Sequence, residues 1–481
     1  MPANTGLTYL EMPVQWERYE PARGKYSRAY ISGIISNIMR ADLNSMRVQL
    51  RLGWHYPPKW AAELRHARFI NQYGDVYRAP AASGSNLVNI VFNDEVRAAV
   101  ASTISNLFAD LSACSNVIES VAVSAGVHGE PSFPGPLYNR HANSYWAYDF
   151  SGKLGFMKAM ERKYGGDIDA VNVSWGDRLS SFDEVIFFPG NASSNNVKAR
   201  DFHEWYSGML ADTVVWQYTV IRRYFSGSIV VPFSTSSFLL TANDITGAMK
   251  NNLSGSSAVE QNGLMQSGRT ASRCLAVLRS NALMAVIEAP VCFTNGAVRG
   301  SANAVVADAA ADIRAYGFPV AAVYAGGDAR IVAEEFITNR ITALSYPYTT
   351  NMVQLREGIG AVTACFREIL SNNAREAFSL TASWTATTNV MIEYVLRENQ
   401  FQIIGITVSY RVGDGEWKPA DIIYGHTNGL LASPYGVPHK LVVIPPEGSN
   451  TVFRITPDAD AWTPISGYIP IPAPGTNTAL K

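Results

Sequence analysis

Short apolar stretches alternate with longer stretches of helical periodicity through most of the chain. Each predicted strand is followed by a segment whose apolar residues recur every three or four positions, as on one face of a helix. This alternation favours a parallel sheet, and so many units in succession favour a closed (β/α)8 barrel of the TIM type over an open sheet. The predicted strands are residues 8–16, 46–53, 117–125, 228–234, 258–266, 282–290 and 319–326, and the predicted helices include 27–42, 93–112, 151–164 and 199–225.

The pattern changes near residue 375, where short alternating strands replace the helical stretches. Within this part, "VGDGEW" carries the Asp-Gly signal of a β-hairpin. We therefore expect two domains: an α/β barrel over residues 1–374, and an all-β accessory domain, folded as a sandwich, over residues 375–481.

Composition narrows the class of ligand. The 481 residues carry 39 basic and 40 acidic side chains, so bulk charge draws the chain to neither nucleic acid nor an anionic membrane. No apolar run approaches the roughly 18 residues that span a bilayer. Aromatic residues make up 11% of the chain, and flat rings beside polar groups suit the faces and hydroxyls of sugars. A neutral carbohydrate, oligo- or polysaccharide, is the expected partner.

The sequence gives no sign of a metal, a cofactor or a leader. Nucleotide-binding glycine loops and metal-ligand spacings are missing from it, so no cofactor is expected. The first residues lack a basic segment followed by an apolar run, so we expect no signal peptide. Localisation stays open between the cytoplasm and export by another route, extracellular or virion-associated. Homo-oligomerisation is also open. We expect free thiols at Cys114, Cys274, Cys292 and Cys365.

Two glutamates stand where a barrel holds its chemistry, at the carboxyl ends of predicted strands. Glu130 follows the strand 117–125 within "HGEPSFP", and Glu288 ends the strand 282–290 within "IEAP". Cleavage of a glycosidic bond needs two carboxyl groups that flank it. With three strand units between them, the two glutamates are expected to face each other across the pocket. The alternative is structural: a strand-end glutamate that caps a helix or pairs with an arginine.

The segment "VQWERYEPARGKYSRAYISGIISNIMRADLNSMRVQLRLGWHYPPKW" resembles glycoside hydrolases of clan A, particularly the β-galactosidases of family 42. Two further stretches, "SAGVHGEPSFP" and "FHEWYSGML", are similar to β-amylase. The resemblance covers about residues 8–345. The family 42 motif positions are Trp16, Glu20-Pro21, Gly24-Lys25-Tyr26 and Pro58-Lys59-Trp60.

This resemblance implies roles for both glutamates. Glu130 corresponds to the acid/base at the end of the fourth barrel strand, and Glu288 to the second carboxylate at the end of the seventh. Clan A favours a retaining mechanism with Glu288 as nucleophile. The β-amylase likeness favours inversion, with Glu288 activating water. The distance between the two carboxyl groups distinguishes the mechanisms: it is about 5–5.5 Å in retaining enzymes and about 6.5–9.5 Å in inverting enzymes.

The chain departs from family 42 at two points. Gly129 stands where the family has an Asn that holds the 2-hydroxyl of the sugar, which leaves galactose-type specificity open. The family's first strand also has no obvious counterpart. Either residues 87–92 complete the count, or the barrel is open or permuted, or the chain is shortened at its N-terminus.

Further polar and aromatic residues near the predicted strand ends are candidates for sugar contacts. For Arg51 the alternative is an ion pair with a carboxylate of the barrel, and for Trp54 it is core packing. Glu20 is expected to be structural. The candidates are Trp16, Arg51, Trp54, His55, His128, Trp146, Gln261, Asn262, Tyr324 and Asp328.

The sequence therefore predicts an O-glycoside hydrolase with a retaining two-glutamate mechanism, in which Glu130 is the acid/base and Glu288 the nucleophile. An inverting, β-amylase-like hydrolase is one alternative. A second is a non-catalytic carbohydrate-binding protein, an adhesin or tail-spike module built on a glycosidase barrel. A lyase or isomerase is a weaker third, because no metal cluster or basic catalytic residue stands clearly at the strand ends.

Overall fold

The structure is a computed structural model, and the chain divides into two compact units. One comprises residues 1–3, 7–291 and 304–323, and the other 4–6, 292–303 and 324–481. The predicted boundary between residues 374 and 375 stays a prediction. Up to residue 365 the structure describes 9–44, 46–78, 87–126, 129–135, 138–141, 144–186, 197–238, 271–291, 309–324, 329–345, 357–358, 360–362 and 364–365; beyond it, 415–416 and the strands given below.

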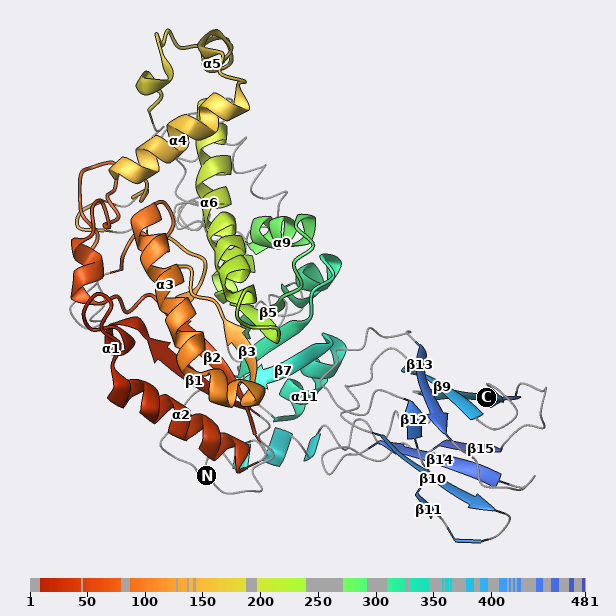
Figure 1. The fold of residues 1–481 in the computed structure, drawn as a ribbon. Helices are drawn as coiled ribbons and strands as arrows, with labels where there is room; N and C mark the ends of the chain where they lie inside the picture. Colours follow the sequence, from red (N-terminus) through yellow and green to blue (C-terminus); the bar gives the residue numbers. More distant parts are fainter. Residues whose placement is uncertain are drawn as a thin grey trace. The chain divides into compact units, whose positions relative to one another are not determined.

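Seven strands of the described residues form one sheet in chain order, and the first five pair in parallel (Figure 1). The parallel arrangement confirms what the strand–helix alternation predicted. The strand 258–266 lies outside the described residues, and the last strand of the sheet was not predicted. The strands are β1 (Tyr9–Gln15), β2 (Arg47–Gly53), β3 (Ile118–Ala122), β4 (Ser228–Pro232), β5 (Val286–Val291), β6 (Val320–Tyr324) and β7 (Ile341–Ser345).

Helices connect the strands, as the sequence predicted. Asn93 caps α3 by accepting a hydrogen bond from the Val96 N–H, and Asp149 caps α4 in the same way through Gly152. Figure 1 shows α3 beside the long α6. The helices are α1 (Trp16–Tyr19), α2 (Arg28–Asp42), α3 (Asp94–Asp110), α4 (Phe150–Lys163), α5 (Ile168–Trp175), α6 (Val197–Arg222), α9 (Ala271–Ser280) and α11 (Ala329–Thr338), with 3₁₀ turns η1 (Lys59–Glu63), η2 (Ser112–Val117), η4 (Phe182–Glu184) and η5 (Thr235–Phe238).

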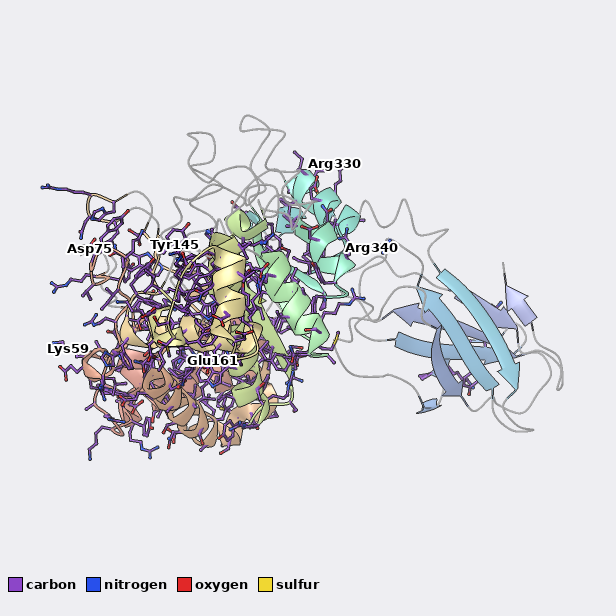
Figure 2. All side chains as sticks on the ribbon, turned by 90° about the horizontal axis from the view of Figure 1, so that it is seen from above. Lys59, Asp75, Tyr145, Glu161, Arg330 and Arg340 are labelled. Atoms are coloured by element: carbon purple, nitrogen blue, oxygen red, sulfur yellow. The ribbon has the colours of Figure 1, made fainter. Side chains whose placement is uncertain are left out.

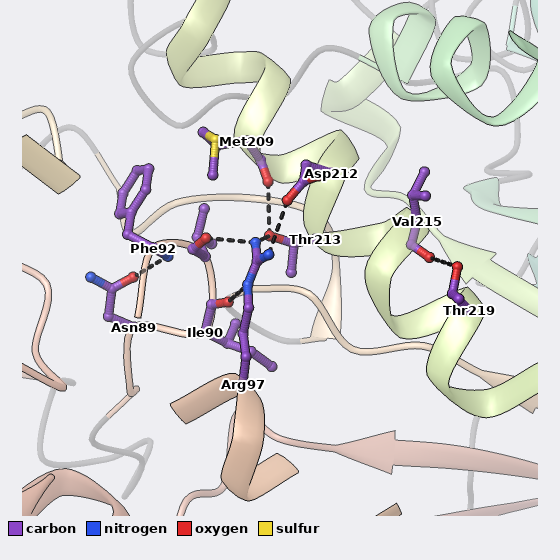
Figure 3. A network of polar contacts seen from close by, with 10 residues as sticks. Asn89, Ile90, Phe92, Arg97, Met209, Asp212, Thr213, Val215 and Thr219 are labelled. Carbon is purple, nitrogen blue, oxygen red and sulfur yellow. Dashed lines mark hydrogen bonds and ion pairs between the residues drawn. The ribbon is translucent and has the colours of Figure 1, made fainter. Parts of the chain in front are cut away.

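Residues 87–92 are buried but do not form a strand of the sheet, so the proposal that they complete the strand count is wrong. The guanidinium of Arg97 donates hydrogen bonds to two carbonyl oxygens of this segment instead: Nε donates to Ile90 O at 3.0 Å, and Nη2 donates to Val91 O at 2.7 Å (Figure 3). The same guanidinium reaches Asp212 and Thr213 of α6. A side chain of α3 thus satisfies two backbone carbonyls of this segment that a strand ladder would otherwise pair.

Glu20 is structural, as expected from its place after β1. It is buried, and it accepts hydrogen bonds from Trp16 Nε1 at 3.1 Å, the Gly24 N–H at 2.8 Å and Thr103 Oγ1 at 2.6 Å. Thr103 belongs to α3, so one carboxylate joins the Trp-Glu-Pro segment to the helix beside it. Three donors on a buried carboxylate offset the cost of its desolvation.

The C-terminal strands form two antiparallel sheets, in the orders β11-β10-β14-β15 and β12-β13-β9-β8-β16. All-β structure in this part agrees with the short alternating pattern of its sequence. Their packing as a sandwich stays a prediction. The strands are β8 (Phe378–Trp384), β9 (Val390–Leu396), β10 (Ile406–Val412), β11 (Lys418–Pro419), β12 (Ile422–Tyr424), β13 (Pro438–Val443), β14 (Thr451–Pro457), β15 (Gly467–Pro470) and β16 (Thr478–Leu480).

Candidate active site

Glu288 lies on β5 with its carboxylate buried against an arginine. The residue is 3% exposed, and both carboxylate oxygens accept from Nη2 of Arg51 on β2, at 2.7 and 2.9 Å. Its register partner is Pro232, the last residue of β4. Glu288 therefore sits level with the carboxyl end of the neighbouring strand, the side on which barrel enzymes carry their chemistry.

Arg51 also binds a second carboxylate, that of Glu11 on β1, at 2.6 Å from the same Nη2. The alternative for Arg51, an ion pair with a carboxylate of the barrel, is therefore observed. The role of Arg51 in a sugar subsite stays a prediction. Burial alone lowers the pKa of Arg51, but Glu288 and Glu11 outweigh burial and raise it. The guanidinium is therefore a permanent cation beside two carboxylates.

Burial raises the pKa of Glu288 above that of an ordinary glutamate. Arg51 opposes this rise, whereas the negative charge of Glu11 adds to it. Gln49 of β2 also hydrogen-bonds to the Glu288 carboxylate and favours its charged form. The protonation of Glu288 therefore depends on burial, on the opposing charges of Arg51 and Glu11, and on the hydrogen bonds that the carboxylate accepts.

Glu130 stands on a turn that folds back onto its own backbone. The Gly129 N–H donates to Gly126 O at 3.2 Å, and the Ala125 N–H donates to Gly129 O at 3.3 Å. A Cβ on Gly126 would lie 2.0 Å from Ser132 O, a separation at which backbone atoms must move. Glycine at position 126 therefore permits the turn that carries the half-buried Glu130.

Gly129 has a local reason for its departure from the family 42 pattern. Its φ is +88°, in the region that favours glycine, and an added Cβ would lie 3.3 Å from Cε1 of His55. An Asn at this position would adopt a backbone conformation that L residues rarely take, and the imidazole would have to shift by a few tenths of an ångström. Glycine at position 129 has no side chain to take the hydrogen-bonding role of that Asn.

His55 and Gln217 both bind Ser124, two residues beyond the end of β3. His55 Nδ1 lies 3.0 Å from Ser124 Oγ. The Gln217 amide of α6 is buried, accepting from the Ser124 N–H at 3.1 Å and donating to Ser124 O at 2.8 Å. Sequence reasoning missed Gln217, although a lone amide in the apolar run "VVWQYTV" was a signal. Together they hold the segment that leads into Glu130.

Three of the predicted sugar-contacting tryptophans are core residues, and the structure corrects their assignment. Trp16 has no exposed surface and packs edge-on against Trp54 and Trp60. Trp54 donates its indole N–H to Gln217 Oε1. Trp146 is also fully buried, and its indole donates to Gly135 O at 3.1 Å. A ring enclosed on both faces offers no stacking surface to a sugar.

The loops after β2 and β3 are joined to each other. The Tyr145 N–H donates to Gln72 Oε1 at 2.8 Å, and the Tyr148 N–H donates to Ile70 O at 2.9 Å. Figure 2 shows Asp75 and Tyr145, one from each loop, on the same side of the unit. The segments that flank His55 and Glu130 therefore brace one another.

The remaining candidates are not placed. His128, Gln261, Asn262 and Asp328 lie outside the described residues, and only the backbone of Tyr324, at the end of β6, is described. Glu130 follows β3, and Glu288 lies on β5. β4 pairs with both of these strands. In the sheet they are thus two strands apart, not three as predicted.

Replacing Gly126 with Ala is expected to disrupt the turn. The Cβ would meet the Ser132 carbonyl oxygen, and overpacking of this kind costs about 1–3 kcal/mol. Calorimetric melting should therefore show a lower Tm, accompanied by a loss of any activity that depends on Glu130. Gly135→Ala is the matched control, because a Cβ at Gly135 has no atom of the described residues within 4 Å. Equal melting temperatures for the two variants would contradict the crowding.

The described residues contain no group of three or more His, Cys, Asp or Glu side chains that could hold a metal ion. In the same part of the chain, no helix is long and apolar enough to cross a bilayer.

Solved structures with similar folds are glycoside hydrolases by their names. The catalytic domain of β-amylase from Paenibacillus polymyxa matches with a TM-score of 0.58 at 14% identity, over 75% of this chain and 92% of that domain. The β-galactosidase of Marinomonas ef1 matches with a TM-score of 0.53 at 13% identity, and that of Rahnella sp. R3 with 0.51 at 9%. No protein-family model matches the sequence. Neither does any curated protein.

These similarities show that the chain has the α/β fold of the (β/α)8 glycoside hydrolases. The chain spans 56% and 51% of the lengths of the two β-galactosidases. Because β-amylase and β-galactosidases share the fold, the likeness does not distinguish family 42 from other glycosidases, and family 42 membership stays a prediction. At identities this low the likeness concerns the fold, and activity is a separate question.

Proposed function

We propose that this protein is an O-glycoside hydrolase that cleaves an oligo- or polysaccharide with Glu130 and Glu288 as its carboxyl pair. The observation that carries the proposal is the buried Glu288 carboxylate, held by Arg51 near the carboxyl ends of the strands. The glycosidase fold and the braced turn under Glu130 support it. The β strands of residues 375–481 would form an accessory sandwich domain.

In this proposal Glu130 protonates the leaving oxygen while the glycosidic C–O bond breaks. A carboxylate oxygen of Glu288 forms a bond to the anomeric carbon, and the departing sugar takes the proton as its hydroxyl hydrogen. Water then attacks the glycosyl-enzyme, Glu130 accepts its proton, and Glu288 is released as carboxylate. Arg51 supports the role of Glu288 as nucleophile, because a neighbouring guanidinium favours the ionised carboxylate that attacks the anomeric carbon.

Hydrolysis can be tested by incubating the full chain with soluble starch, a β-galactan and a β-mannan, and measuring reducing ends. Release from at least one polysaccharide, abolished in a Glu130→Gln/Glu288→Gln double variant, is the expected result. Proton NMR of the first-formed anomer then separates retention, which we propose, from inversion. Inverted product would assign Glu288 as the base that activates water.

A non-catalytic carbohydrate-binding barrel is the second candidate. The observation that favours it is that both oxygens of Glu288 already contact Arg51 in a buried site. A binder would retard in affinity gels containing one of these polysaccharides while releasing no reducing ends from it. Retardation by one of these polysaccharides, with no release of reducing ends from any of the set, would replace the hydrolase proposal with this one.

A further inference from the structure

One nitrogen atom of Arg51 faces more acceptors than it has hydrogens. Nη2 carries two N–H groups, yet it lies 2.6 Å from Glu11 Oε2, 2.7 Å from Glu288 Oε1 and 2.9 Å from Glu288 Oε2. Three short contacts on two hydrogens require sharing. Glu11 and Glu288 therefore compete for the same donor.

The two carboxylates also repel each other, because their negative charges lie close together beside one guanidinium. The two carboxylates lie 2.6 and 2.7 Å from one nitrogen, so these oxygens cannot be more than 5.3 Å apart, the sum of the two distances. Two carboxylates on one guanidinium leave one negative charge uncompensated. Glu288 is buried, whereas the Glu11 side chain is 39% exposed, so the uncompensated charge opposes ionisation of the buried Glu288 carboxyl.

Glu11 reaches this position because strand register aligns it with the site. It pairs with Gln49, which donates to Glu11 Oε2 at 3.2 Å and accepts from Ser120 Oγ at 3.0 Å. Arg51 lies two residues beyond Gln49, on the same face of β2. Among the described residues, the charged groups that act on Glu288 are Arg51 and Glu11.

We propose that Glu11 is a positioning residue of the site: by drawing the Arg51 N–H groups away from Glu288, it sets the pH at which the Glu288 carboxyl ionises. Its catalytic consequence rests on the proposed function, because a nucleophile or base must be ionised to act. The negative charge of Glu11 raises the pKa of Glu288, so removing that charge lowers it. The acidic limb of kcat/KM should then move to lower pH.

Glu11→Gln tests the inference with a direct readout. Carbon-13 NMR of chains labelled at the glutamate carboxyl carbon, with the Glu288 resonance assigned by its loss in Glu288→Gln, follows the ionisation itself. We expect the Glu288 resonance to titrate at lower pH in Glu11→Gln than in the parent, and kcat/KM to follow. Glu11→Asp, which withdraws the carboxylate by one methylene, should fall between them and serves if Glu11→Gln does not fold.

Glu119→Gln is the matched control, because it removes the same charge from a neighbouring strand. Glu119 is the extra residue where the β2–β3 register shifts between Ile118 and Ser120, and its charge acts on Tyr9. It is not among the groups that act on Glu288. In Glu119→Gln, the Glu288 carboxyl should titrate at the same pH as in the parent protein. An unchanged titration in Glu11→Gln, or an equal change in Glu119→Gln, would overturn the inference. A shifted titration alongside full activity in Glu288→Gln would instead overturn the proposed function and leave the coupling intact.

Discussion

Glu288→Gln is expected to lower kcat by at least about 10³-fold on any polysaccharide that the parent hydrolyses. The amide keeps the shape of the side chain but cannot attack the anomeric carbon or accept a proton from water. Arg51 keeps Glu11 as an ion-pair partner, so the guanidinium is not left without a carboxylate and the fold should survive. Steady-state kinetics with a melting curve for each variant provide the measurement.

Glu288→Ala adds a test of role. If Glu288 is the nucleophile, a small anion such as azide can enter the space that the side chain leaves, where Arg51 would attract it. Azide should then restore turnover of an activated aryl glycoside and yield a glycosyl azide. Activity of Glu288→Gln within tenfold of the parent, in a protein that melts normally, would refute the assignment of Glu288.

Glu130→Gln is expected to lower kcat/KM by about 10²–10⁴-fold on substrates with a sugar leaving group. An alkoxide leaves poorly unless it is protonated, and Gln has no proton of suitable acidity to give. A nitrophenyl glycoside, whose phenolate leaves without help, should lose much less in the bond-breaking step. The contrast between the two substrates therefore identifies an acid and is not expected from a general loss of structure.

Ser132→Ala is the control for Glu130→Gln. Ser132 lies in the same turn, and its buried hydroxyl has no hydrogen-bond partner among the described residues. Removing this hydroxyl should leave the ratio of kcat/KM values for the two kinds of substrate, with sugar and with nitrophenolate leaving groups, as it is in the parent. Equal losses on both substrates in Glu130→Gln would mean that Glu130 supports the turn and is not the acid.

Local patterns in the sequence were sufficient for most of the first unit. The Asn93 cap of α3 and the alternation of apolar strands with helices depend on neighbouring residues, so they could be read along the chain. Residues 87–92 show the limit of this reading. They are as apolar as a strand, but Arg97 from α3 donates to the carbonyls of Ile90 and Val91, and no local pattern reports a partner on another element.

The candidate site divides in the same way. Glu130 and Glu288 were identifiable because each stands near the end of an apolar strand beside proline. Trp16 and Trp146 were assigned to substrate because aromatic residues look alike in sequence whether their faces are open or enclosed. Packing alone distinguishes the two cases, since burial depends on residues from several elements.

By itself the sequence determined the α/β alternation, the all-β C-terminal part and two strand-end glutamates. The tertiary structure decided that Glu288 shares Arg51 with Glu11, because parallel register brings together side chains of three strands that lie 40 and 237 positions apart in the chain. It also decided that Gly129 faces His55, which a linear pattern does not contain. Strand-end residues follow from local hydrophobic periodicity, whereas their charges depend on neighbours that only folding provides.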